Sequence, residues 1–329
     1  ALGMFGADLV PHTRALAAAI ERTRADVVVG DFLMFGAFLA ARLQRRPFAA
    51  FYHSALPFPG PERPPFGSGL PFDAPRSEWA SARREFNSIS ELSLSMLRGA
   101  CRELGLPETS RDILSAPYSD SCNLLATTRE LEPGLPEFSG PVHFVGPCIE
   151  GRVEEHDHPV FEALKQGSTR VYVSMGTVFN TNRAVFISVL RGLDRPGVQV
   201  IVSAGASFEA LQKRPPTSNA TYFARVPQLA VLRRVDLVVG HGGNNSTLET
   251  LAAGKPLIVV PFGGDQLENA RRVEALGTGV AVLPDQLSAG AISRAFDLAL
   301  GKSDRARALG ASLQGVDGTA ASVSILESL

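Results

Sequence analysis

Short apolar runs rich in β-branched residues alternate with longer helix-forming segments along most of this chain. Such alternation is typical of parallel sheets whose strands are joined by crossover helices, so it predicts an α/β fold. In the second half we predict strands at residues 170–174, 198–202, 220–223, 236–239, 257–260 and 279–282. In the first half we predict strands at residues 27–30, 48–52, 123–126 and 142–145, and a long helix over 77–104.

The length of 329 residues favours two domains over one. Residues 149–159 are charged and aperiodic, which is typical of a linker. We therefore predict one domain over residues 1–150 and a second over 151–329, both Rossmann-like and facing each other. The chain starts without Met and enters an amphipathic helix at once, so we expect the first domain to lack its opening strand and helix.

The composition excludes several classes of protein. A net charge of −1, with no block rich in Lys and Arg, argues against nucleic-acid binding. The most apolar window, residues 27–41, contains Asp31 and is too short to cross a bilayer, so we expect no membrane insertion. Three widely spaced cysteines favour reduced, buried thiols in a cytoplasmic protein over a disulfide framework or a zinc site.

Residues 235–254, VDLVVGHGGNNSTLETLAAG, place a predicted strand, a glycine-containing turn and a helix in succession. Open α/β folds bind ligands at such turns, on the carboxyl edge of the sheet. Glycines allow close approach of the backbone, and the unpaired N–H groups and dipole of the helix attract an anion such as phosphate. His241, Asn245 and Ser246 add side-chain donors. The alternative is an Asn-rich helix cap beside a neutral core histidine.

Glu249 follows Asn245 by about one helical turn, so we expect it to face the same site. A carboxylate there would repel phosphate but can accept hydrogen bonds from sugar hydroxyls. A nucleotide ribose meets that requirement.

These residues closely resemble the donor-binding signature of glycosyltransferase family 1, whose members are metal-independent transferases of the GT-B fold. The similarity runs from Val226-Pro227-Gln228, through His241 to Glu249, to Gly264-Asp265-Gln266 and Asn269. Residues 171–180, VYVSMGTVFN, look like the macrolide-glycosyltransferase branch. The resemblance covers essentially the C-terminal half. It implies a hexosyltransferase of EC class 2.4 that acts in natural-product or antibiotic biosynthesis.

The resemblance also implies roles for individual residues. His241, Asn245 and Ser246 would bind the diphosphate, and Glu249 the ribose hydroxyls. Asp265 and Gln266 would hold hydroxyls of the transferred sugar, Thr177 would reach the β-phosphate, and Ser203 would contact the nucleotide. The full donor-binding set is Thr177, Ser203, Arg225, Val226, Gln228, His241, Gly243, Asn244, Asn245, Ser246, Glu249, Asp265 and Gln266.

One position departs from the family pattern. The family usually has an aromatic residue, stacked on the base, where this chain has Arg225. A guanidinium plane can also stack on a base. Alternatively, Arg225 lies on the surface and Val226 alone contacts the base edge. The presence of Glu249 favours a UDP-sugar over a dTDP-sugar as donor.

The family mechanism is an inverting displacement in which a histidine takes the proton of the acceptor hydroxyl and an aspartate orients that histidine. The segment VVVGDF, residues 27–32, matches the position of the aspartate, so we expect Asp31 to be the orienting carboxylate. Its alternative is a helix N-cap. The matching histidine has no counterpart here. His53 is the nearest substitute base, and its alternative is a residue of the acceptor pocket or the core.

The segment FPGPERPPFGSGLPF, residues 58–72, has too many prolines for a helix or a core strand. An apolar loop over the cleft favours an apolar acceptor, for which we predict a pocket of Phe32, His53, Phe58 and Phe66. The alternative is a loop packed on its own domain.

These observations lead to three functional hypotheses. The first is a glycosyltransferase that binds a nucleotide sugar and a small apolar acceptor and acts as a monomer or homodimer, without a cofactor or metal. The others are an NDP-sugar epimerase and a non-catalytic nucleotide-sugar-binding helper of the same fold. Residues 154–158, EEHDH, are adjacent in a predicted linker and unlikely ligands of one ion. No G-x-G-x-x-G follows a predicted strand, which disfavours a dehydrogenase.

Overall fold

A computed structural model describes residues 9–109, 112, 114, 117–149, 158–164, 167–176 and 182–329. The chain packs into two units, and the second, Ile149–Gly315, is inserted into the first. Val316–Leu329 therefore return to the first unit, whereas the sequence prediction kept all residues after 150 in one second domain.

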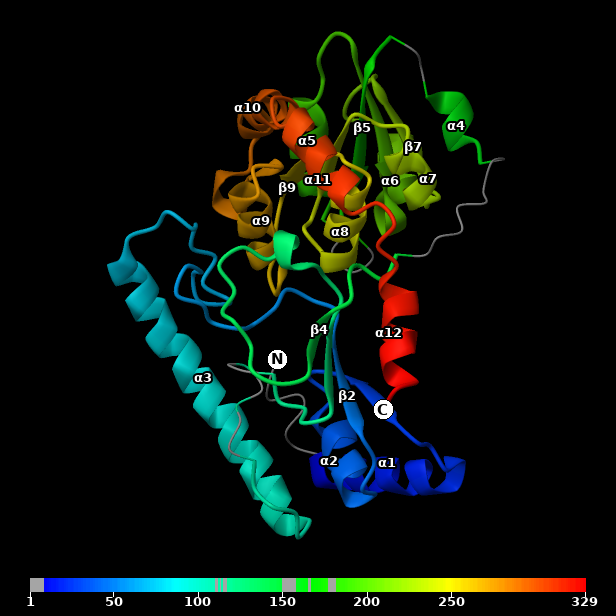
Figure 1. The fold of residues 1–329 in the computed structure, drawn as a ribbon. Coiled ribbons are helices and arrows are strands. Elements are labelled where there is room, and N and C mark those ends of the chain that lie inside the picture. The colour runs from blue at the N-terminus through cyan, green and yellow to red at the C-terminus, as the bar shows by residue number, and fades with distance from the viewer. Residues whose placement is uncertain are drawn as a thin grey trace. The chain divides into compact units, whose positions relative to one another are not determined.

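The first unit contains a parallel sheet in the order β1-β2-β3-β4, of which Figure 1 labels β2 and β4. Its strands are β1 (Val28–Asp31), β2 (Phe48–Tyr52), β3 (Cys122–Leu125) and β4 (Val142–Phe144). Its helices are α1 (Leu9–Thr23), α2 (Phe35–Leu43), α3 (Arg76–Glu103), the short 3-10 helix η2 (Arg129–Leu131) and α12 (Gly318–Leu326). β1 pairs with β2 so that Asp31 lies beside Phe51, which brings the carboxyl ends of both strands together.

In two helices of this unit, the distribution of apolar residues in the sequence matches the surfaces that the helix buries. Helix α2, FGAFLAARL, is apolar on almost every side and is correspondingly buried. Helix α12 packs Ala321 and Ile325 against Ala49 and Leu124 of the sheet, which explains why the end of the chain belongs to this unit. Burial of such side chains is the main favourable contribution to folding.

The second unit contains a parallel sheet in the order β10-β9-β8-β5-β6-β7. Its strands are β5 (Thr169–Ser174), β6 (Val198–Ser203), β7 (Ala220–Phe223), β8 (Leu237–Gly240), β9 (Leu257–Val259) and β10 (Gly279–Ala281). Its helices are α4 (Val160–Ala163), α5 (Arg183–Gly192), α6 (Phe208–Lys213), α7 (Gln228–Leu232), α8 (Asn244–Ala252), α9 (Gln266–Ala275), α10 (Ala289–Leu300) and α11 (Ser303–Ser312), with short 3-10 turns η3 (Gly205–Ser207) and η4 (Pro284–Gln286). The chain order reverses between the neighbours β5 and β8, the kind of switch point at which open α/β sheets bind ligands.

A bidentate ion pair joins these two central strands at their amino ends. The Arg170 guanidinium donates to both carboxylate oxygens of Asp236, over 2.9 and 3.1 Å, and the Arg170 backbone N–H donates to the same carboxylate at 2.8 Å. Planar two-point pairs of this kind have a defined geometry. The pair therefore helps to fix the register of β5 beside β8, at the end of the strands away from the switch point.

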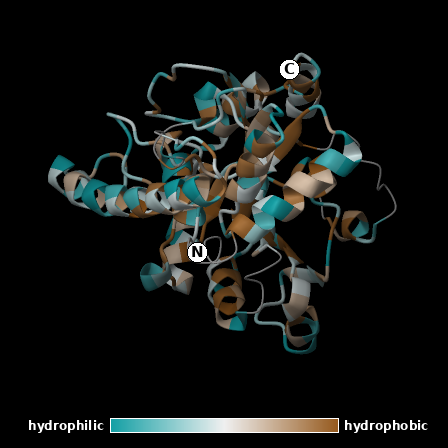
Figure 2. Ribbon diagram, turned by 90° about the horizontal axis from the view of Figure 1, so that it is seen from below, coloured by the Kyte–Doolittle hydropathy of each residue, from teal (hydrophilic) through white to brown (hydrophobic). Residues whose placement is uncertain are grey.

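The predicted strands are all present, with bounds within one residue of those predicted, and the α/β prediction is confirmed. Brown, hydrophobic strand segments are visible in Figure 2, and β3, β8 and β9 are buried along their whole length. Helices α2, α4, α6 and α11 were not given bounds in the prediction. The three cysteines are free, but Cys148 is exposed, contrary to the expectation that all three are buried. Within the described ranges, no helix combines the length and hydropathy that a bilayer crossing requires.

Candidate functional site

A cleft of about 820 Å³ opens at the switch point of the second unit. Its walls come from the carboxyl ends of β5, β6 and β7 and from α7 and α8. Six predicted donor-binding residues line it: Ser203, Arg225, Val226, Gln228, Ser246 and Glu249. Tyr172, Ser174 and Gly176 line it as well and were not predicted. Tyr172 and Ser174 alternate along β5, so period-two spacing was the signal that could have identified them.

Helix α8 begins beside this cleft with an uncapped and positively polarised end. Its N-cap is Gly243, no side chain caps it, and its first turn contains no acidic residue. The first N–H groups of a helix have no partner within the helix, and the dipole adds partial positive charge there. This end of α8 is therefore suited to bind an anion.

His241 precedes α8 and fits between two glycines. A Cβ atom on Gly176 would lie 2.5 Å from His241 Cε1, and one on Gly243 would lie 2.5 Å from His241 Nε2. Gly176 also has a φ of +70°, which side-chain-bearing residues rarely adopt. Burial lowers the pKa of His241, against the opposing effects of the Asp265 charge and the Ser174 backbone. Burial therefore favours the neutral imidazole, which carries one N–H donor.

Glu249 belongs to a hydrogen-bonded group in the cleft wall. The Gln228 amide nitrogen donates to Glu249 Oε2 at 2.5 Å and to Ser246 Oγ at 3.3 Å. The Tyr172 hydroxyl donates to Gln228 Oε1 at 3.0 Å. Burial raises the pKa of Glu249, while the hydrogen bond from Gln228 opposes that shift.

The segment before α9 is held by side chains that point into the unit. Gln266 is 5 % exposed, and its Oε1 accepts a hydrogen bond from the Phe262 backbone N–H at 2.7 Å. The Asn269 amide donates to the Gly242 carbonyl at 2.7 Å and to Asp265 Oδ2 at 3.4 Å. Asp265 thus lies near the turn at His241, whereas the Gln266 carbonyl oxygen is engaged in holding the loop.

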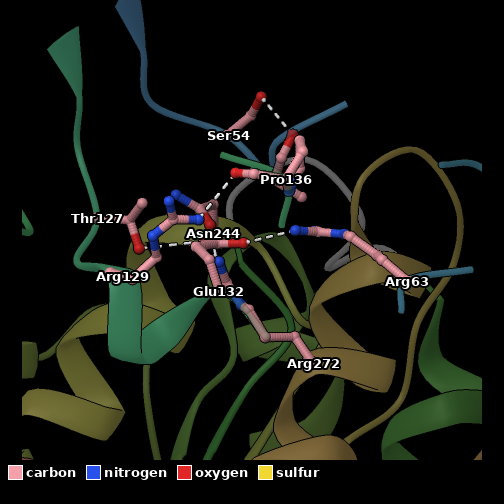
Figure 3. A network of polar contacts seen from close by, with 9 residues as sticks. Ser54, Arg63, Thr127, Arg129, Glu132, Pro136, Asn244 and Arg272 are labelled. Carbon is pink, nitrogen blue, oxygen red and sulfur yellow. Dashed lines mark hydrogen bonds and ion pairs between the residues drawn. The ribbon is translucent and has the colours of Figure 1, made fainter. Parts of the chain in front are cut away.

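Three further donor-site predictions, Asn244, Asn245 and Thr177, are not among the described residues that line the cleft. Asn244 is 8 % exposed, and its Oδ1 accepts from the buried Arg272 guanidinium at 2.9 Å, as Figure 3 shows. Its side chain therefore supports the turn from inside. Asn245, the next residue, is exposed. Thr177 lies outside the described residues.

In the first unit, Asp31 and His53 form a pair at the carboxyl ends of β1 and β2. His53 Nε2 contacts Asp31 Oδ2, and Asp31 Oδ1 accepts from the Leu33 backbone N–H at 2.7 Å. Although burial opposes it, these hydrogen bonds lower the pKa of Asp31. Asp31 does not cap α2, whose N-cap is Met34. A histidine oriented by an ionised aspartate is the arrangement used for general-base catalysis.

The predicted acceptor-pocket phenylalanines belong largely to the core. Phe32 and Phe58 are 4 % and 1 % exposed, and both pack against Tyr52. Phe66 is partly buried against Phe86. The structure thus places Phe32 and Phe58 inside the unit, in line with the alternative of a loop packed on its own domain. Of the four predicted residues, His53 presents the most open side chain, with 51 % exposed.

The proline-rich loop is anchored by a buried ion pair. Arg63 Nη1 lies 3.1 Å from Glu132 Oε2, and Thr127 donates to the other Glu132 oxygen at 3.2 Å, as Figure 3 shows. The Arg63 and Glu132 side chains are 4 % and 0 % exposed. The backbones also meet closely, because a Cβ on Gly60 would lie 2.0 Å from the Gly134 carbonyl oxygen. The loop is therefore fixed to the segment after β3.

A second hollow, of about 480 Å³, lies in the first unit between this loop and α3. Its lining includes three arginines, Arg76, Arg83 and Arg84, beside Trp79, but none of the predicted acceptor residues. Within the described part of the chain, no group of three His, Cys, Asp or Glu residues could hold a metal ion. Most of the 154–158 cluster lies outside that part, so metal independence stays a prediction.

Residues 182–314 match the family model "Glycosyltransferase family 28 C-terminal domain". The uncharacterized UDP-glucosyltransferase YojK of Bacillus subtilis is 31 % identical over 63 % of this chain and 51 % of its own length. The 4'-demethylrebeccamycin synthase of Lentzea aerocolonigenes is 28 % identical over 85 % of this chain and 67 % of its own. The chain's relatives are glycosyltransferases. The resemblance inferred from the sequence is confirmed, although the matching model is named for family 28 and not for family 1.

The fold comparison agrees. The glycosyltransferase of kitacinnamycin superposes with a TM-score of 0.77, covering 99 % of this chain and 81 % of that one, at 21 % identity. The fold is that of the GT-B glycosyltransferases. The chain spans about half the length of several curated relatives that it matches.

Proposed function

We propose that this protein transfers a hexose from a nucleotide sugar to a hydroxyl group of a small apolar natural product, with inversion and without a metal ion. The observation that carries this proposal is the cleft at the β5–β8 switch point. It lies beside the uncapped start of α8 and is lined by Ser246 and Glu249 of that helix. The α8 amides and neutral His241 would neutralise the departing diphosphate, as preorganised donors do in other enzymes.

A UDP-sugar is favoured as donor over a dTDP-sugar because Glu249 can accept a hydrogen bond from a ribose 2′-hydroxyl. The name of YojK, a UDP-glucosyltransferase, is consistent with that choice. Arg225 is exposed at the cleft, where its guanidinium can stack on the base. Asp265 remains our candidate for binding the sugar hydroxyls. The Gln266 carbonyl oxygen holds the loop, so only the Gln266 amide nitrogen could also bind the sugar.

Titration calorimetry with UDP, followed by mass spectrometry of acceptor mixtures incubated with UDP-glucose, tests the proposal. We expect UDP to bind and a product heavier by one hexose to appear. Glu249→Ala should bind UDP more weakly. UDP binding without any transfer would instead favour the non-catalytic helper, and sugar conversion without acceptor would favour the epimerase.

Asp31 is proposed to orient the histidine that removes the acceptor proton. We expect Asp31→Asn to lower kcat by about 10²- to 10⁴-fold, because an amide does not stabilise the imidazolium that forms. The rate of hexose transfer at saturating donor measures this effect. His53→Asn is the matched variant, since His53 contacts Asp31. If His53→Asn loses as much kcat as Asp31→Asn, His53 is the base. If His53→Asn loses little, Asp31 orients a different histidine. An unchanged rate in Asp31→Asn would contradict the role of Asp31.

A further inference from the structure

Tyr172 is a buried residue of β5 that determines how the Gln228 amide is oriented. Its hydroxyl donates to Gln228 Oε1 at 3.0 Å, and its side chain is almost completely enclosed. The Gln228 amide nitrogen must then point the other way, toward Glu249 and Ser246. This orientation is also the only one that suits Glu249, because an ionised carboxylate accepts hydrogen bonds and cannot donate them.

Tyr172 orients Gln228, and Gln228 in turn holds Glu249 as a hydrogen-bond acceptor. Burial raises the pKa of Tyr172 to about 12, so its hydroxyl stays a donor at neutral pH. The Gln228 amide donates to one oxygen of Glu249 and opposes the rise in its pKa that burial causes. The other Glu249 oxygen is left to accept a hydrogen bond at the cleft.

We propose that Tyr172, acting through Gln228, is a positioning residue that sets the preference of the cleft for a nucleoside diphosphate with a ribose 2′-hydroxyl. This inference rests on the proposed function, because it assigns Glu249 to the ribose. If the amide turned over, its carbonyl oxygen would face the carboxylate. Glu249 would then be displaced or protonated, and the 2′-hydroxyl would lose its acceptor.

Binding of UDP and of 2′-deoxy-UDP, measured by titration calorimetry, tests this role. A hydrogen bond to a charged group corresponds to a preference of about tenfold or more, which we expect the unaltered protein to show for UDP. Tyr172→Phe should reduce that preference at least threefold. Tyr222→Phe is the control: its hydroxyl, on β7, is buried and Tyr222 does not line the cleft, so the preference of this variant should match that of the unaltered protein.

Two further variants separate positioning from a general loss of structure. Gln228→Glu sets two carboxylates against each other and should also abolish the preference while leaving Tyr172 intact. In a Glu249→Gln background, Tyr172→Phe should change the ratio no further, since coupled residues are not additive. An unaltered ratio in Tyr172→Phe would overturn the role of Tyr172, while UDP binding by the unaltered protein would still uphold the proposed function. Failure of the unaltered protein to bind UDP would overturn both.

Discussion

Gly243→Ala is expected to weaken UDP binding about 10- to 100-fold while leaving the fold intact. The new Cβ would lie 2.5 Å from His241 Nε2, a separation that real Cβ atoms do not show, so the imidazole must move. Its neighbour on the other side is Gly176, which leaves the ring little room to shift. Loss of one hydrogen bond to a charged diphosphate costs about 1.5–3 kcal/mol, which corresponds to that range of affinity.

The matched control is Gly240→Ala, three residues earlier in β8. A Cβ there would meet only ordinary contacts, the nearest being 3.5 Å from the Ser174 carbonyl oxygen. Calorimetric titration of both variants with UDP should separate them by at least a factor of ten. Equal affinities for the two alanine variants would show that His241 does not contact the diphosphate.

Arg63→Met should lower the free energy of unfolding of the first unit by about 3–5 kcal/mol. The substitution removes the Arg63 partner of the buried Glu132 carboxylate, and breaking a buried ion pair by deleting one partner is strongly destabilising. Urea denaturation followed by tryptophan fluorescence measures the effect in this unit alone, because Trp79 is the single tryptophan of the chain. The urea concentration at the midpoint of unfolding should fall in proportion to the loss of stability.

Two comparisons make this result specific. Arg102→Met removes an exposed partner of Glu108 and should cost no more than about 1 kcal/mol. Replacing both Arg63 and Glu132 by Met should recover much of the stability, since the buried charge is then gone. A midpoint for Arg63→Met equal to that of Arg102→Met would contradict the importance of the buried pair.

The sequence predicted the strands and the switch-point turn because both depend on local pattern. Apolar β-branched runs mark the strands, and glycine and polar residues mark the strand-to-helix turn. Ser246 and Glu249 could be predicted because each faces the start of the helix, whereas Ser203 was expected only from its match to the family pattern. Neighbouring parallel strands share a carboxyl edge, so these residues meet wherever the strands pair.

The direction in which a side chain points was less predictable. Asn244 and Gln266 occupy signature positions, yet hydrogen bonds to Arg272 and to the Phe262 backbone turn them inward. Phe58 lies in a proline-rich loop but fills the core, since tertiary packing supplies partners that local sequence does not reveal. The contact between Asp31 and His53 depends on the pairing of β1 with β2, which spacing in the sequence does not specify.

The return of α12 to the first unit has a practical consequence for attempts to exchange donor preference between related enzymes. Joining two halves at a single crossover near residue 149 would replace α12 by a foreign helix and leave Ala49 and Leu124 against side chains that did not evolve with them. A chimaera should instead graft residues 149–315 as a cassette with two junctions. The recipient then keeps its own C-terminal helix and the surface that this helix covers.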